Sequence, residues 1–193
     1  MKIGAYIPYC KKLSEYIFKV CQQFNTCDRL LIEECDFNKK PESEYRNEAL
    51  EKMEDCDLVW MIDADEFILR EHQLEIIDNL KREKKDIGLC PVIDYTTDYD
   101  FKYKDRGHNA IVIVNPKKVR FYDERCVHLD NANTFSDYPL HHFGFAFQSA
   151  EIMKWKKDNY WSKSNINEHS ELLKRAIERS NIPEEIETLL REV

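Results

Sequence analysis

Apolar and polar positions alternate along the chain in a pattern that predicts short strands and amphipathic helices. Residues 2–8, which are apolar after Lys2, predict a first strand, which we expect Pro8 to end. Residues 13–24 carry apolar side chains at helical spacing, and residues 29–34 contain a central apolar triplet, so a helix and a second strand are expected there. This β-α-β order favours an α/β domain with parallel strands at its start.

The uninterrupted apolar segment of residues 58–62 predicts a strand that is buried on both faces. It reads Leu-Val-Trp-Met-Ile, and three carboxylates, Asp63, Asp65 and Glu66, follow within four positions. Because an unpaired carboxylate is costly to bury, we expect these acids at the solvent-facing point where the strand leaves the sheet. Ligands of open α/β sheets bind at this carboxyl end of the strands.

The rest of the pattern predicts an alternation of helices and strands, followed by a helical tail. We expect Ser43 to cap one helix, Pro183 to open the last one, and Pro91 to mark an edge strand or a bulge. Residues 94–109 interleave aromatic and charged side chains, which fits either a stacking wall for a sugar or base, or a short hairpin on the sheet. The other expected elements are helices over residues 43–54, 71–85 and 149–160, strands over 87–93, 110–114 and 119–122, and two short helices within 168–193.

The acids after the buried strand predict a site for a divalent cation. Asp63 and Asp65 are two positions apart, so an extended chain points both side chains the same way. Carboxylate oxygens suit Mg²⁺ or Mn²⁺, and these ions usually complete their coordination with substrate phosphates. The alternative is an ordinary α/β domain whose acids only solvate the end of a strand.

Composition narrows the class of protein. The 193 residues fit one domain, and the formal net charge of −8 argues against a broad basic face for nucleic acid. The seven cysteines are scattered, with no Cys-x-x-Cys pair, and the chain contains neither a signal-like start nor an apolar stretch of membrane-spanning length. Together these features favour reduced thiols and a cytoplasmic protein without a transmembrane segment.

Three segments resemble the GT-A-fold, family-two-like glycosyltransferases that use nucleotide sugars. Residues 63–67, Asp-Ala-Asp-Glu-Phe, are similar to the family's Asp-x-Asp signature, and residues 46–47, Arg-Asn, to the pair that opens the preceding helix. Residues 142–145, His-Phe-Gly-Phe, are similar to the segment that carries the family's metal-binding histidine. The resemblance implies a GT-A-type single domain over residues 1–165, with a central mixed sheet flanked by helices. The helical tail, residues 166–193, is then expected to pack on the domain or to form a homodimer contact.

The resemblance also implies which side chains hold the metal ion. Asp65 and His142 are the expected ligands, with Asp63 assisting, and Asp65 would take part in catalysis through the ion. Adjacent residues of an extended chain point in opposite directions, so only one of His141 and His142 is expected to reach the metal. The resemblance selects His142.

Other positions are implied to bind the sugar-nucleotide donor. Pro8 and Asp36 would lie around the nucleoside, with Glu34 as the rival of Asp36. Arg46 either faces the donor pyrophosphate or clamps the carboxylates of the motif. Lys157 would offset phosphate charge.

The function implied is transfer of a sugar from a nucleotide-diphosphate sugar, with a UDP-sugar favoured, to an acceptor hydroxyl. A glycan or a lipid-linked precursor is the expected acceptor, and a modified nucleic-acid base is the minority alternative. Asp130 follows a segment similar to a Val-His-Glu run of the family, displaced by one residue, and is the candidate catalytic base. A nucleotidyltransferase is disfavoured because no glycine-rich loop follows the first strand, and a non-catalytic binding module on the same scaffold is the other alternative.

Overall fold

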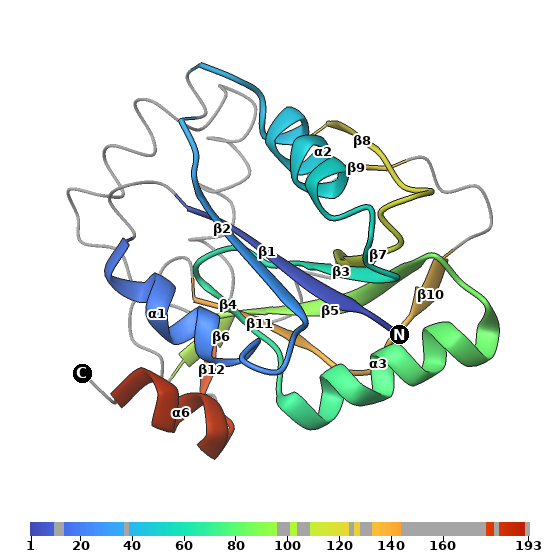
Figure 1. Ribbon diagram of the computed structural model, residues 1–193. Coiled ribbons are helices and arrows are strands. Elements are labelled where there is room, and N and C mark those ends of the chain that lie inside the picture. The colour runs from blue at the N-terminus through green and yellow to red at the C-terminus, as the bar shows by residue number, and fades with distance from the viewer. Residues whose placement is uncertain are drawn as a thin grey trace.

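A computed structural model shows a mixed sheet with helices on both faces (Figure 1). It describes residues 1–9, 14–36, 39–95, 101–103, 109–123, 126–127, 133–143, 177–179 and 182–191. The helices are α1 (Ser14–Gln22), α2 (Glu42–Lys52), α3 (Arg70–Glu83) and α6 (Glu184–Arg191). The predicted helix over 149–160 lies outside these described ranges.

Within the described residues, eight strands form the main sheet, seven of them in the order β2-β1-β3-β7-β5-β11-β4, with β10 also paired to β5. The strands β1, β2 and β3 run parallel, β7 is antiparallel to β3 and β5, and β11 is parallel to β5 but antiparallel to β4. The members are β1 (Ile3–Tyr9), β2 (Arg29–Glu34), β3 (Leu58–Met61), β4 (Glu66–Phe67), β5 (Ile87–Asp94), β7 (Asn109–Val114), β10 (Asn133–Phe135) and β11 (Leu140–His142). Two small sheets pair β6 (Phe101–Tyr103) with β12 (Ile177–Arg179) and β8 (Phe121–Asp123) with β9 (Cys126–Val127).

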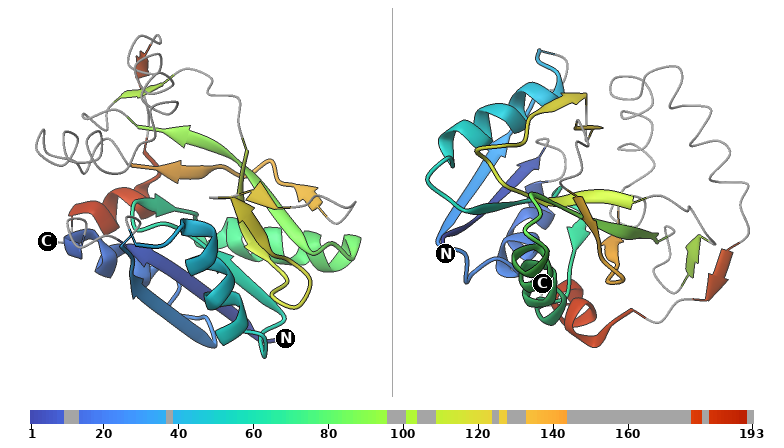
Figure 2. Two further views of the ribbon diagram at one scale, coloured as in Figure 1. Left: turned by 90° about the horizontal axis from the view of Figure 1, so that it is seen from above. Right: turned by 90° about the vertical axis from the view of Figure 1, so that its right-hand side faces the viewer.

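Successive side chains of the central strands point to opposite faces of the sheet, so each face carries an apolar layer. Trp60 packs on the face covered by α1, α3 and α6, whereas its neighbours Val59 and Met61 pack on the face covered by α2. All four residues of β3 are buried, as the apolar run predicted for a central strand. Figure 2 shows α2 beside the small hairpin β8–β9 on its own face of the sheet.

Pro8 lies inside β1, which continues to Tyr9, so the prediction that it ends the strand is wrong. The carbonyl of Tyr6 accepts a hydrogen bond from Ile62 on the β3 side of the strand. Pro8 is two residues further along and faces the same side, where the pairing with β3 has already stopped at Met61. The missing N–H of the proline therefore costs no hydrogen bond in the ladder.

One other local expectation is wrong, and another is wrong in one of its two alternatives. The second helix begins at Glu42 after Pro41, without a side-chain cap, so Ser43 is not its N-cap. The strand β5 lies inside the sheet rather than at its edge, although its register with β7 does shift between Gly88 and Leu89.

The C-terminal residues that the structure describes pack on the domain. Ile186 is buried in the same core cluster as α1 and α3, and the N–H of Arg70 donates to Glu185 at 3.2 Å. Residues 177–179 form β12 against β6, so the helix expected to include Ile177 is wrong there. Cross-strand pairing has overridden the helical pattern of the sequence.

None of the described helices combines the length and apolar character that crossing a membrane requires. Six cysteines fall within the described part of the chain, and each is a free thiol.

Candidate functional site

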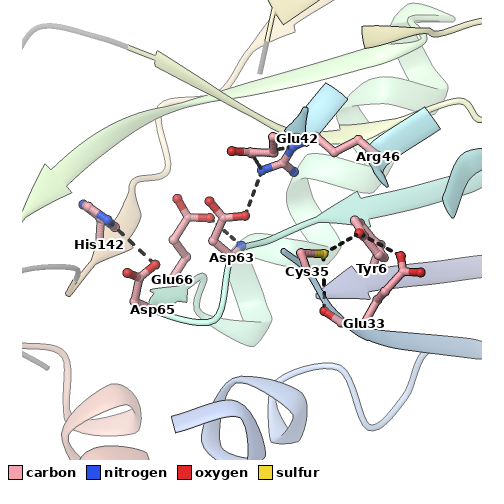
Figure 3. A network of polar contacts seen from close by, with 9 residues as sticks. All are labelled: Tyr6, Glu33, Cys35, Glu42, Arg46, Asp63, Asp65, Glu66 and His142. Carbon is pink, nitrogen blue, oxygen red and sulfur yellow. Dashed lines mark hydrogen bonds and ion pairs between the residues drawn. The ribbon is translucent and has the colours of Figure 1, made fainter. Parts of the chain in front are cut away.

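The predicted site lies where β1, β2 and β3 end side by side. The parallel register aligns Tyr9 with Glu34 and Tyr6 with Met61, so the carboxyl ends of the three strands meet at one edge of the sheet. Asp63 and Asp65 follow β3 at this edge (Figure 3). Such an edge is where α/β sheets bind their ligands.

The chain turns sharply between Asp63 and Glu66. The N–H of Glu66 donates to the carbonyl of Asp63 at 3.1 Å, and the N–H of Asp63 donates to the Glu66 carboxylate at 2.9 Å. The segment is therefore a turn rather than the extended chain on which the expectation for Asp63 and Asp65 was based, and their carboxylates have different partners, Arg46 and His142 (Figure 3). The expectation that these acids face solvent fits only Asp63, whose side chain is 34% exposed, because Asp65 and Glu66 are buried.

Arg46 holds Asp63 in place. Its guanidinium is fully buried, and Nη2 donates to Asp63 Oδ1 at 2.8 Å. Nε donates at 2.8 Å to Glu42, one helical turn earlier on α2, and the guanidinium also lies 5.7 Å from the ring centre of Phe121. Of the two roles predicted for Arg46, the structure contains the ion pair with a carboxylate of the motif, Asp63. Contact with a donor phosphate stays a prediction.

Asn47, the second residue of the Arg-Asn pair, ties α2 to β8. Its amide nitrogen donates to the carbonyl of Phe121 at 2.8 Å, and its amide oxygen accepts from the N–H of Phe121 at 2.8 Å. The side chain thus pairs with β8 as a neighbouring strand would. Asn47 and Arg46 together place the ring of Phe121 against the guanidinium that holds Asp63.

His142 lies between two carboxylates. Its Nε2 is 3.8 Å from Asp65 Oδ1, and its Nδ1 is 2.5 Å from Asp94 Oδ1. Strand pairing sets both contacts, because β11 places His142 opposite Asp94 of β5 and opposite Glu66 of β4. Nothing in the sequence identified Asp94, because only the pairing of β5 with β11 brings it to the histidine.

The two carboxylates favour the protonated form of His142 when no metal ion competes for the ring. Burial acts to lower the pKa of His142, but the negative charge of Asp65 and the hydrogen bond that the ring donates to Asp94 outweigh it, so the pKa is raised above 6.5. A metal ion at Nε2 would have to displace this proton.

The neighbouring His141 faces the core. It is 3% exposed, and its Nδ1 lies 2.9 Å from the hydroxyl of Tyr95, whose ring stacks on Phe143 at 4.3 Å. Burial lowers the pKa of His141 to about 4, with smaller contributions from His72 and Lys102. The two histidines therefore point in opposite directions, as the alternation along the strand predicted, while the ligand role of His142 stays a prediction.

Asp65 and His142 fit a divalent ion as a partial ligand set. Neighbouring ligands of an octahedral ion at about 2.1 Å are roughly 3 Å apart, so the 3.8 Å between Oδ1 and Nε2 requires only a small closure. Within the described ranges, no three His, Cys, Asp or Glu side chains form a metal cluster. The described part of the site thus offers two ligands, which suits an ion that takes its others from substrate phosphates and water.

The remaining predicted residues divide into two groups. Pro8 and Asp36 lie near the site: Asp36 follows β2, its carboxylate pairs with Lys39 at 3.0 Å, and its N–H donates to the Tyr45 hydroxyl at 3.1 Å. Its rival Glu34 is the last residue of β2. The positions of Asp130 and Lys157 lie outside the described residues.

Comparison with known proteins identifies similar structures but no similar sequence. No protein-family model and no curated protein matches the chain. The structure of S. aureus TarS 1-349 in complex with UDP-GlcNAc is similar with a TM-score of 0.53 and 13% identity, over 87% of this chain and 64% of that one. A second crystal structure of S. aureus TarS gives a TM-score of 0.50 and 13% identity, over 90% of this chain and 43% of that one. The chain spans less than two thirds of these TarS chains, and the likeness supports the predicted GT-A-like fold.

Proposed function

We propose that this protein is a glycosyltransferase that uses a nucleotide-diphosphate sugar, with a UDP-sugar favoured, and depends on Mn²⁺ or Mg²⁺. The observation that carries the proposal is the approach of His142 to Asp65 at the carboxyl end of the central strands. A fold similar to that of TarS, which has been crystallised with UDP-GlcNAc, supports the choice of donor.

In this proposal, Asp65 and His142 hold the divalent ion, and Asp63 assists from its partly exposed position. An ion held there would be a Lewis acid and would stabilise charge on the diphosphate leaving group. Arg46 keeps the carboxylate of Asp63 in place through its buried ion pair. The guanidinium of Arg46 also offsets part of the negative charge of the three acids in this turn, Asp63, Asp65 and Glu66.

The donor would lie along the ends of β1 and β2, near Pro8 and Asp36. Lys157 is proposed to offset phosphate charge, and Asp130 to act as the base that takes the proton of the acceptor hydroxyl. The acceptor is proposed to be a glycan or a lipid-linked precursor, with a nucleic-acid base as the alternative.

A donor screen followed by a product assay tests the proposal. Thermal shift with UDP-, GDP-, CMP- and dTDP-sugars in the presence of Mn²⁺ should identify one donor class, and that donor should then release its nucleoside diphosphate. Chelation of the metal should stop the release, and Asp65→Asn should reduce it by on the order of 100-fold or more.

The matched control is Asp55→Asn, because Asp55 is an exposed carboxylate paired with Lys2 and Arg29 rather than with the site. It should leave the release rate unchanged. Binding of a donor without any turnover would favour the non-catalytic module, and binding of none of the four donor classes would contradict the proposal.

A further inference from the structure

Asp94 is a buried carboxylate whose position the fold fixes. It is 1% exposed and ends β5, where the pairing with β11 sets it opposite His142. Its Oδ1 lies 2.5 Å from Nδ1 of that histidine. Burying a carboxylate is costly unless charged or polar partners compensate it, so its place at this imidazole needs a physical explanation.

The contact determines which nitrogen of His142 faces Asp65. A carboxylate accepts a hydrogen bond and cannot donate one, so Nδ1 must carry the proton that Asp94 accepts. In the neutral ring, Nε2 then has the free lone pair, and Nε2 is the atom that lies 3.8 Å from Asp65. Histidines that bind metals usually donate their other N–H to a carboxylate or a carbonyl in this way.

We propose that Asp94 is a positioning residue of the divalent-ion site, holding the ring of His142 so that Nε2 and Asp65 together face the ion. This inference rests on the proposed function, because it assumes the ion that Asp65 and His142 would share. It adds a residue that touches neither the ion nor the donor and acts only through the histidine.

The adjacent residues of the same two strands offer a built-in control. One position further along, Tyr95 contacts Nδ1 of His141 through its hydroxyl at 2.9 Å, on the core side of the sheet. Both pairs therefore join a histidine of β11 to the end of β5, but only the Asp94 pair faces Asp65. Damage to strand pairing in general should affect both pairs equally.

The test measures Mn²⁺ affinity of the metal-free protein in the absence of donor, by the loss of the electron paramagnetic resonance signal of free Mn²⁺ at pH 8. Asp94→Asn keeps the size of the side chain and removes its charge, and it should weaken Mn²⁺ binding by about 10- to 100-fold. Tyr95→Phe should leave the affinity within about twofold. In a His142→Ala background, Asp94→Asn should cause no further loss, because the residue through which it acts is gone.

The outcomes separate this inference from the function on which it rests. If His142→Ala weakens Mn²⁺ binding and Asp94→Asn does not, the metal site stands and the role of Asp94 is wrong. If Asp94→Asn weakens binding equally with and without His142, Asp94 acts independently of the ring and the inference is overturned. If the unaltered protein binds no Mn²⁺, both the metal site and the inference fail.

A measurement on the unaltered protein guards against variants that do not fold. Long-range ¹H–¹⁵N spectra at pH 8 should show the His142 proton on Nδ1, both alone and with Mg²⁺ present. A neutral ring whose single proton lies on Nε2 would overturn the inference without any substitution, because Asp94 would then accept no proton from Nδ1.

Discussion

Removing the guanidinium of Arg46 should destabilise the protein more than any surface ion pair can. The side chain is fully buried between Glu42 and Asp63, whose side chains are 10% and 34% exposed. Arg46→Ala leaves both carboxylates without this partner, and breaking a buried pair in this way typically costs about 3–5 kcal/mol. Because Asp63 can regain some water, we expect the lower end, about 3 kcal/mol of unfolding free energy.

Urea denaturation followed by circular dichroism measures this loss, and thermal unfolding should shift downward by roughly 6–12 °C. The control is Lys52→Ala on the same helix, because Lys52 pairs with Glu33 at 3.1 Å while remaining 46% exposed. An exposed pair contributes at most about 1 kcal/mol. The reasoning is refuted if Arg46→Ala costs no more than Lys52→Ala.

A double variant shows whether uncompensated charge causes the loss. Adding Asp63→Asn to Arg46→Ala removes one of the two carboxylates left behind, so part of the lost stability should return. If the two losses simply add, the stability lost with Arg46 comes from packing rather than from charge.

Three further outcomes are expected. The pKa of His141 is about 4 in the folded protein against 6.5 for the free side chain, so between these pH values the unfolded chain binds a proton that the folded chain does not. The free energy of unfolding should therefore keep its full value above pH 6.5 and fall by about 3 kcal/mol towards pH 4. His141→Phe should remove this part of the pH dependence, as measured by urea denaturation at a series of pH values. Mn²⁺ should bind on the order of tenfold more tightly than Mg²⁺ in calorimetry, because the imidazole of His142 is a softer ligand than oxygen; equal affinities would contradict its role as a ligand. Asn47→Ala removes two hydrogen bonds to Phe121 and should cost about 2 kcal/mol in unfolding free energy, whereas an unchanged midpoint would show that α2 holds β8 by packing alone.

Local pattern was a sound guide to the elements of the sheet because burial dictates it. The apolar run of residues 58–62 predicted β3, whose four residues are all buried, and the β-α-β start matches β1, α1 and β2. Pattern was a poor guide where distant pairing decides the outcome. Ile177 has helical spacing in the sequence but pairs with Tyr103 in a small sheet, and no local rule contains that partner.

The site shows the same division between local and distant information. Position in the sequence identified the acids after β3 and the opposite directions of the two histidines. It could not identify Glu42 or Asp94, because each acquires its role through one contact, with Arg46 or with His142. It also misjudged Asp65, which the turn and the pairing of β4 with β11 leave buried.

The pairing of β11 with both β5 and β4 has a consequence for how the chain folds. The expected metal ligands, Asp65 and His142, are 77 positions apart (142 − 65 = 77), whereas β1, β2 and β3 form from neighbouring segments within the first 61 residues. Contacts between distant segments close late because loop closure costs entropy before the contact forms. During refolding, amide hydrogens of β1 and β3 should therefore gain protection before those of β4 and β11. A chain still emerging during synthesis would then have β1, β2 and β3 in place while the two expected metal ligands were still apart.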